Sequence, residues 1–241
     1  MTKETFINRL FLGFQQNNLG KILTNENAEQ LYLLAELLVS TNKQYNLTAI
    51  TDQDGIILKH FIDSATISEL IPQDASVLDV GCGAGFPSLP IAILRKDVRV
   101  TSIDSTGKKI EFVNKVAEEL ALSNIKGICA RAEEFASVSR ETFEVCTSRA
   151  VARLNILSEL CIPFIKKNGL FIAMKSSKGK EEYAEASNGI SKLGCILADE
   201  RQITLSLDSE SIEREIYVFQ KASETPAIYP RNYSQICKKP L

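Results

Sequence analysis

The chain has 241 residues, of which 44% are hydrophobic and 24% charged, and a formal net charge of −2 at pH 7. This composition is typical of a soluble globular protein of one or two domains and excludes a polycation, so an RNA partner requires a local basic face. One histidine, and six cysteines with no C-x-x-C pair, argue against a bound metal and indicate a reducing, cytoplasmic compartment.

The N-terminal part of the chain is predicted to be helical. Its first 20 residues hold scattered charges and no long apolar run, so we expect neither a signal peptide nor a membrane-spanning segment. Apolar residues then recur at three- and four-residue steps. The predicted helices cover residues 4–16, residues 27–40, and a segment that begins at an N-cap, Thr51 or Asp52, and carries His60 and Asp63. We expect residues 1–71 to form a helical region that packs on the remainder.

Strands and helices alternate over residues 72–221. Strands are predicted at residues 77–80, 98–104, 125–130, 143–147, 170–175, 195–201 and 215–221, the last two as a possible hairpin. Helices are predicted at residues 89–94, 108–120, 154–165 and 178–193. This alternation predicts an α/β fold with a doubly wound, mainly parallel, Rossmann-like sheet of seven strands. Residues 222–241 form a basic tail.

A glycine turn follows the first predicted strand. Gly81, Gly83 and Gly85 alternate, and glycines let the backbone approach a flat ligand closely. A dinucleotide fingerprint has its third glycine at the sixth position, where this chain has Phe86. The G-x-G-x-G spacing, with Asp79 two residues before it, is similar to motif I of class I S-adenosylmethionine-dependent methyltransferases.

Two further positions are candidates for cofactor contacts. Asp104 ends the second strand, where a carboxylate can accept hydrogen bonds from both ribose hydroxyls, although it is equally suited to be the N-cap of the next helix. Ala132 and Glu133 follow the third strand and are placed to border an adenine. The alternative for Glu133 is a solvated helix start, where acidic residues suit the helix dipole.

Arg149 and Arg153 follow the fourth strand, at the position that faces the reacting group. The Pro-Pro loop of amine methyltransferases and the Pro-Cys nucleophile of pyrimidine methyltransferases are both absent there. An arginine suits an anionic or guanine-bearing substrate, whereas the alternative is a surface arginine paired with an acid. Guanine N7 offers an in-plane lone pair, so its methylation requires alignment and no general base. We therefore assign no catalytic residue and expect Arg149 to act by positioning.

The remaining candidates are His60, Asp63 and a set of basic residues. His60 and Asp63 either wall the pocket or, as a lone histidine on an apolar helix more often does, belong to the core. Lysines after the fifth strand are either solvated or part of a basic rim for RNA phosphates. The predicted rim comprises Arg149, Arg153, Lys175, Lys178, Lys180, Arg231, Lys238 and Lys239.

Several motifs in fixed order resemble one family. They are Asn42-Lys43, Asn46-Leu47-Thr48, His60, Asp63-Ser64, Asp79-Val80-Gly81, Gly85-Phe86-Pro87, Arg131-Ala132-Glu133, Ser148-Arg149-Ala150-Val151-Ala152, Tyr229-Pro230-Arg231 and Pro240-Leu241. Together they resemble the bacterial small-subunit ribosomal RNA methyltransferase G family, also called glucose-inhibited division protein B. The resemblance extends from about residue 30 to residue 241.

The resemblance implies transfer of a methyl group from S-adenosylmethionine to N7 of one guanine (guanosine 527 in the family's nomenclature) in 16S rRNA, free or in a 30S particle. It implies a class I methyltransferase fold and cofactor contacts by Gly81, Phe86, Ala132, Glu133 and Arg149. We expect a monomer. Three other hypotheses stay open: a small-molecule methyltransferase, an NAD-linked oxidoreductase and a non-enzymatic RNA-binding module.

Overall fold

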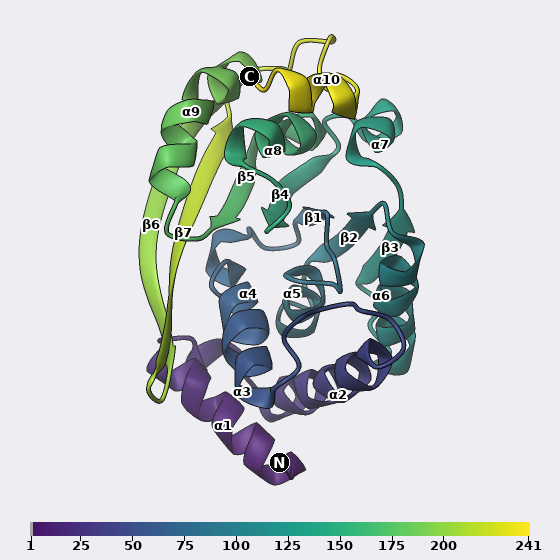
Figure 1. Cartoon of the computed structure of the whole chain (residues 1–241), viewed down its shortest axis with the longest axis vertical. Helices are drawn as coiled ribbons and strands as arrows, with labels where there is room; N and C mark the ends of the chain where they lie inside the picture. Colours follow the sequence, from purple (N-terminus) through teal and green to yellow (C-terminus); the bar gives the residue numbers. More distant parts are fainter. Residues whose placement is uncertain (1) are drawn as a thin grey trace.

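Seven strands form one sheet in the computed structural model, which describes residues 2–241. The strands are β1 (Ser76–Val80), β2 (Arg99–Asp104), β3 (Ile125–Cys129), β4 (Phe143–Arg149), β5 (Ile165–Lys175), β6 (Cys195–Leu207) and β7 (Glu210–Lys221). Their order in the sheet is β3-β2-β1-β4-β5-β7-β6, with β1 to β5 parallel and β7 antiparallel to both β5 and β6 (Figure 1). The predicted mainly parallel seven-stranded sheet is confirmed.

Helices cover both faces of this sheet (Figure 1). The α-helices are α1 (Lys3–Gln16), α2 (Asn25–Asn42), α3 (Gln53–Gly55), α4 (Asp63–Ala65), α5 (Ser88–Leu94), α6 (Gly107–Glu119), α7 (Ala132–Ser139), α8 (Leu154–Cys161), α9 (Gly179–Lys192) and α10 (Tyr233–Lys238). Short 3₁₀ turns lie at Gly20–Ile22, Ser68–Leu70 and Ile162–Phe164. One apolar core joins α1, α2, α5 and α6 to one face, and a second joins α7, α8 and α9 to the other. Among residues 2–241, no helix combines the length and apolar character needed to span a bilayer.

Several predicted boundaries are wrong. The helix expected over residues 154–165 ends at Cys161, because Pro163 lacks the N–H that a helix interior needs, and β5 already begins at Ile165. The last two strands are longer than predicted and meet in a hairpin whose turn contains Asp208 at φ +53°. The helix expected to carry His60 is present and begins after the predicted N-cap Asp52, but its central part, Ile56–Ile62, is a π-helix with six of its seven side chains buried. An α-helix with one apolar stripe would not bury them all.

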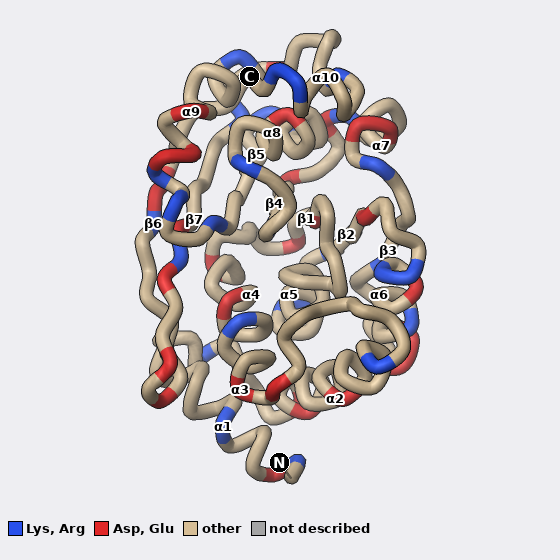
Figure 2. Tube along the Cα trace, viewed as in Figure 1, with Lys and Arg blue, Asp and Glu red and all other residues tan. Residues whose placement is uncertain are grey.

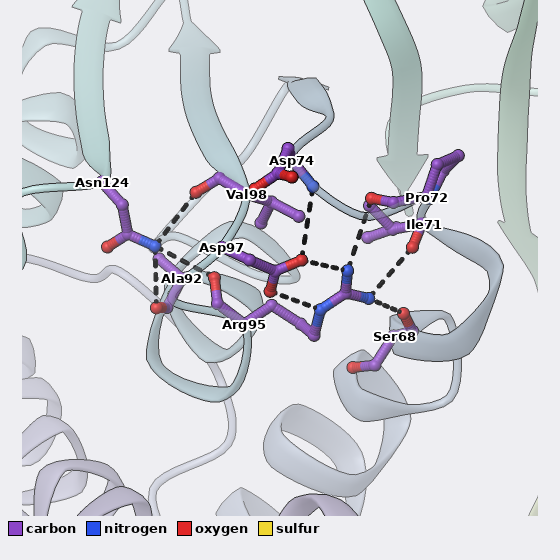
Figure 3. Close-up of polar contacts among 9 residues, drawn as sticks. All are labelled: Ser68, Ile71, Pro72, Asp74, Ala92, Arg95, Asp97, Val98 and Asn124. Carbon is purple, nitrogen blue, oxygen red and sulfur yellow. Dashed lines mark hydrogen bonds and ion pairs between the residues drawn. The ribbon is translucent and has the colours of Figure 1, made fainter.

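The helical N-terminal region is joined to the sheet through Arg95, at the amino edge of β2 (Figure 3). Its guanidinium donates to the backbone carbonyls of Ser68 (2.5 Å), Ile71 (3.0 Å) and Pro72 (3.3 Å). It also donates twice to Asp97, at 2.7 and 2.6 Å. These bonds satisfy carbonyls that the end of the helical region leaves without partners, so Arg95 fixes the entry into β1.

Candidate active site

The three glycines after β1 have different surroundings. All three have positive φ, at +70° for Gly81, +58° for Gly83 and +86° for Gly85. A Cβ on Gly81 would collide with Val151, and a Cβ on Gly85 would collide with Leu89, whereas Gly83 faces open space. Gly85 therefore allows α5 to approach the sheet, and Gly81 and Gly83 shape the exposed side of the turn.

A cavity of about 370 Å³ lies at the carboxyl ends of β1, β2 and β3, and we call it the glycine-turn cavity. Among the predicted cofactor contacts, Gly81, Asp104, Ala132 and Glu133 line it, and Gly83, Gly85, Phe86 and Arg149 do not. Its other walls come from Val80, Ile103, Ser105, Thr106, Lys109, Ala130, Arg131, Ala150, Val151, Leu160 and Tyr233. Ligands of doubly wound sheets bind at this edge, where the strand order reverses between β1 and β4.

Asp104 fixes the shape of the glycine turn. Its Oδ2 accepts a hydrogen bond from the Gly83 N–H at 3.0 Å, and its Oδ1 accepts one from the Thr106 N–H at 2.8 Å. The alternative prediction, that Asp104 is an N-cap, is wrong because Thr106 occupies that position before α6. Asp104 is buried, with Lys109 Nζ 3.8 Å from its Oδ2. The carboxylate thus joins the ends of β1 and β2 at the cavity wall.

Arg149, the last residue of β4, is held in a buried cluster. Its guanidinium donates to the Lys59 carbonyl at 2.7 Å and to Asp63 Oδ2 at 2.9 Å, and its Nη2 lies 3.2 Å from His60 Nδ1. Asp63 is 1% exposed and also accepts from Arg214 Nε at 3.0 Å. The alternative of a surface arginine is therefore wrong, since the pairing acid is buried. Two arginines share one carboxylate here, which leaves the cluster net positive.

His60 is neutral in this cluster. Burial, and the positive charge of Arg149, lower the pKa of His60 to about 3. Because Arg149 donates toward Nδ1, the proton resides on Nε2, which lies 3.1 Å from Thr48 Oγ1. The ring stacks on Phe86 with a centroid separation of 4.2 Å and an interplanar angle of 7°. The basic nitrogen of His60 is thus already engaged.

A second cavity, of about 530 Å³, opens beside this cluster, and we call it the arginine cavity. Its lining residues are Ile50, Lys59, His60, Asp63, Arg149, Ala150, Val151, Ala152, Arg153, Met174, Lys175, Ser176, Glu182 and Arg214. Five of these are lysine or arginine, and two are acidic. Ala150 and Val151 line both cavities, so the two meet directly after β4. Ala150 has φ +56°, which turns the chain sharply at this boundary.

Comparison with known proteins identifies the family. The GidB family model, described as rRNA small subunit methyltransferase G, matches residues 27–205. The chain belongs to the GidB family. Ribosomal RNA small subunit methyltransferase G of Staphylococcus haemolyticus is 45% identical over 225 residues, covering 92% of this chain and 93% of that protein. The Staphylococcus carnosus protein of the same name is 44% identical over 224 residues, covering 91% and 92%.

Solved structures place this GidB chain in the class I methyltransferase fold, as predicted. Precorrin-6y C5,15-methyltransferase from Geobacter metallireducens superposes with a TM-score of 0.53 at 15% identity, covering 72% of this chain and 90% of that one. M. jannaschii TYW2 in complex with AdoMet gives 0.52 at 14% identity, covering 67% and 75%. Within the described residues, no three His, Cys, Asp or Glu side chains gather in a way that could hold a metal ion.

The predicted basic residues of this GidB chain fall into two groups. Arg153 and Lys175 line the arginine cavity; Arg153 pairs with Glu185 at 2.7 Å, and Lys175 is buried with Glu182 at 2.6 Å. Arg231 instead binds the buried Glu159 at 2.5 Å. Lys238 and Lys239 are exposed at the end of α10. Figure 2 shows basic segments both beside β7 and at the α10 end of the molecule.

Sequence reasoning missed several lining residues. Arg214 shares Asp63 with Arg149, but it lies on a part of β7 that the sequence did not predict as strand. Tyr233 lines the glycine-turn cavity, but it lies in the segment predicted as a basic tail. The alternation of apolar residues at Ile203, Leu205 and Leu207 would have predicted that the first strand of the hairpin continues to Leu207. No local pattern indicates that Tyr233 reaches a cavity built by β1 to β3.

Proposed function

We propose that the protein transfers a methyl group from S-adenosylmethionine to N7 of one guanine in 16S rRNA. The observation that carries this proposal is that two cavities of different character meet at Ala150 and Val151, opposite Gly81. A cofactor in one and a base in the other would come into contact only at this boundary. Membership of the GidB family, the rRNA small subunit methyltransferase G family, supports the same assignment.

The glycine-turn cavity fits a nucleoside cofactor. Its volume of about 370 Å³ lies within the range of small-molecule pockets, and its lining combines Ile103, Val151 and Leu160 with the Asp104 carboxylate. Beneath the turn, Asp79 is fully buried, and its Oδ1 has no hydrogen-bond partner. Burial raises the pKa of this carboxyl to about 7, so a positively charged cofactor bound nearby would favour its ionised form. We therefore place the adenosine against Asp104, Ala132 and Glu133, as the sequence predicted.

The arginine cavity fits an RNA base and its phosphates. Five lysines and arginines line it, and four acids pair with them: Asp63 and Glu182 in the lining, and Glu185 and Glu210 beside it. The remaining excess of one positive charge attracts a polyanion. The guanidinium of Arg149 is paired with Asp63, so it can present a hydrogen-bond donor beside the boundary without a bare charge that would repel a sulfonium. This pairing favours a guanine, whose O6 can accept the hydrogen bond while its N7 stays free to attack the methyl group.

The chemistry requires little from the protein besides alignment. S-adenosylmethionine supplies an electrophilic methyl group on sulfur. Guanine N7 carries a free lone pair, so no proton has to leave before the attack. His60 has its basic Nδ1 occupied by Arg149 and is neutral, which agrees with a site that contains no general base. Ala150, Val151 and Gly81 would align the two reactants and exclude water.

The test is label transfer with the full chain, radiolabelled S-adenosylmethionine and either naked bacterial 16S rRNA or 30S particles. We expect one modified guanine, mapped by cleavage at 7-methylguanosine, and loss of S-adenosylhomocysteine binding in Asp104→Ala. Label on a small molecule instead of rRNA would favour a small-molecule methyltransferase. A thermal shift with NAD and none with S-adenosylhomocysteine would favour an oxidoreductase.

A further inference from the structure

Tyr233, the first residue of α10, forms part of the glycine-turn cavity although it lies far along the chain from the other walls. It is the one aromatic side chain among the described residues that line this cavity. The residue is 43% exposed, so its aromatic ring is accessible at the cavity. An aromatic face left open at a cavity mouth is suited to cover a flat ligand.

The segment that precedes α10 is fixed in place. Arg231 donates to Glu159 from its backbone N–H at 2.8 Å and from Nε at 2.9 Å, and Glu159 is fully buried. Arg140 donates to the carbonyls of Tyr229 and Thr225, both at 2.5 Å. Asn232 caps α10 by accepting from the Gln235 N–H at 3.0 Å. The position of Tyr233 is therefore built into the folded chain.

Tyr233 lies at the end of the cavity away from the arginine cavity. The strand order β3-β2-β1-β4 places Ala132 and Glu133, which follow β3, at one end and Ala150, which follows β4, at the other. The α10 helix lies beside α8 and near α7, which begins at Ala132 (Figure 1). The Cys237 thiol, burial and the Glu133 carboxylate all raise the pKa of the Tyr233 phenol, in agreement with a position near Glu133. The ring is thus remote from the site of methyl transfer.

We propose that Tyr233 contacts the adenine ring of the cofactor and closes the adenine end of the glycine-turn cavity together with Leu160. This inference rests on the proposed function, because it takes the cofactor to be an adenosine derivative. Stacking between an aromatic side chain and a base requires no particular hydrogen-bond pattern, so the ring alone supplies the contact. The C-terminal segment therefore contributes to cofactor affinity.

The experiment measures the dissociation constants of S-adenosylhomocysteine and methylthioadenosine by calorimetry for the full chain and for Tyr233→Ala, Tyr233→Phe and Gln235→Ala. Methylthioadenosine lacks the amino acid moiety, so it isolates the adenosine contact. We expect Tyr233→Ala to weaken both ligands about five- to twentyfold, and Tyr233→Phe to remain within about twofold of the wild type. Gln235, exposed on the same helix with no side-chain hydrogen bond, is the matched control and should have no effect.

Three outcomes would overturn the inference: unchanged affinity in Tyr233→Ala, an equal loss in Gln235→Ala, or a loss in Tyr233→Ala that goes with a lower ligand-free melting temperature. In the last two cases the effect would come from displacement of α10. Failure of the proposed function is distinguishable, because label transfer to rRNA is measured separately. An oxidoreductase would bind neither adenosine ligand, whereas a small-molecule methyltransferase would bind both and leave rRNA unlabelled.

Discussion

Arg95 and Arg149 lie at opposite edges of the sheet and are buried to a similar degree, with side chains 19% and 14% exposed. Arg95, at the amino edge, makes five hydrogen bonds, three of them to backbone carbonyls of one connection. Arg149, at the carboxyl edge, contacts one carbonyl, one carboxylate and one imidazole. Arg149 lines the arginine cavity, and Arg95 lines neither of the two cavities.

Burial alone therefore does not separate a structural arginine from a functional one. At the amino edge, the carbonyls of the connection that precedes β1 use up the Arg95 guanidinium. At the carboxyl edge the connections diverge around the switch in strand order and leave cavities. We expect the loss of Arg95 to lower stability alone and the loss of Arg149 to act mainly on catalysis.

The largest effect is expected for Arg149→Ala. Removing the guanidinium releases His60 and the Lys59 carbonyl from their fixed positions beside the boundary, and a small misplacement there costs about a hundredfold or more in methyl transfer. The fold should persist because Asp63 keeps Arg214 as a partner at 3.0 Å. Label transfer and circular dichroism measure the two effects. Wild-type activity in this variant would remove Arg149 from the site.

Arg95→Ala tests the other edge. The variant leaves three carbonyls and the Asp97 carboxylate without their donor, and we expect the free energy of unfolding to fall by about 2–3 kcal/mol. For a chain of this length the melting temperature should drop by about 5–10 °C. Urea unfolding measures the loss. Activity per folded molecule at low temperature should equal that of the wild type. A loss of activity per folded molecule would contradict a purely structural role for Arg95.

The Asp79→Asn variant tests, through the pH dependence of stability, how the carboxyl edge of the sheet differs from the amino edge. Burial raises the pKa of Asp79 to about 7, so the folded state retains a proton that the unfolded state releases near pH 4. Its contribution to stability therefore falls as pH rises from about 4 to 7 and is lowest above 7. We expect Asp79→Asn to be more stable than the wild type by about 1–2 kcal/mol at pH 8.5. This advantage should disappear near pH 5.

The matched control for this variant is Asp97→Asn at the amino edge. Hydrogen bonds from Arg95 hold the pKa of Asp97 below its ordinary value, so its carboxylate stabilises the fold at neutral pH and loses that effect as pH falls. Urea unfolding at pH 5 and 8.5 should show stabilisation at high pH for Asp79→Asn and destabilisation for Asp97→Asn. The same sign in both variants would contradict the assigned environments.

The sequence predicted the parallel part of the fold because its signals are local. Apolar strands that alternate with amphipathic helices, and Gly81 after β1, follow from residue spacing alone. The boundary at Ile165 was missed because Ile162 and Phe164 continue an apolar run in which only Pro163 signals the end of the helix. No residue spacing reveals that the buried helical segment Ile56–Ile62 takes the π form.

The candidate site was predictable only in part for the same reason. The sequence indicated Asp104, Ala132 and Glu133 from their places after strands, and all three line the glycine-turn cavity. It did not indicate that Lys175 forms an ion pair with Glu182, or Arg231 one with Glu159, because these ion pairs join segments that lie apart in the sequence. The partners of a charged side chain follow from tertiary structure, whereas its position at a strand end follows from sequence.

The smallest expected effect is that of His60 on the pH dependence of stability. Its pKa is lowered to about 3 in the folded state, whereas the unfolded state binds a proton near pH 6.5, so its contribution to stability is lost as pH falls below that value. We expect the free energy of unfolding to fall by about 1 kcal/mol between pH 7 and 5.5.

The protonation of Asp79 raises the stability over the same pH range, so the effect of His60 has to be measured in a chain that lacks this carboxyl. We would compare the Asp79→Asn variant with the double variant Asp79→Asn, His60→Gln. The pH-dependent loss should vanish in the double variant, and label transfer by the Asp79→Asn variant should show no titration near pH 6.5. Such a titration would show that His60 gains a proton in the folded protein and would contradict its assignment as a neutral group.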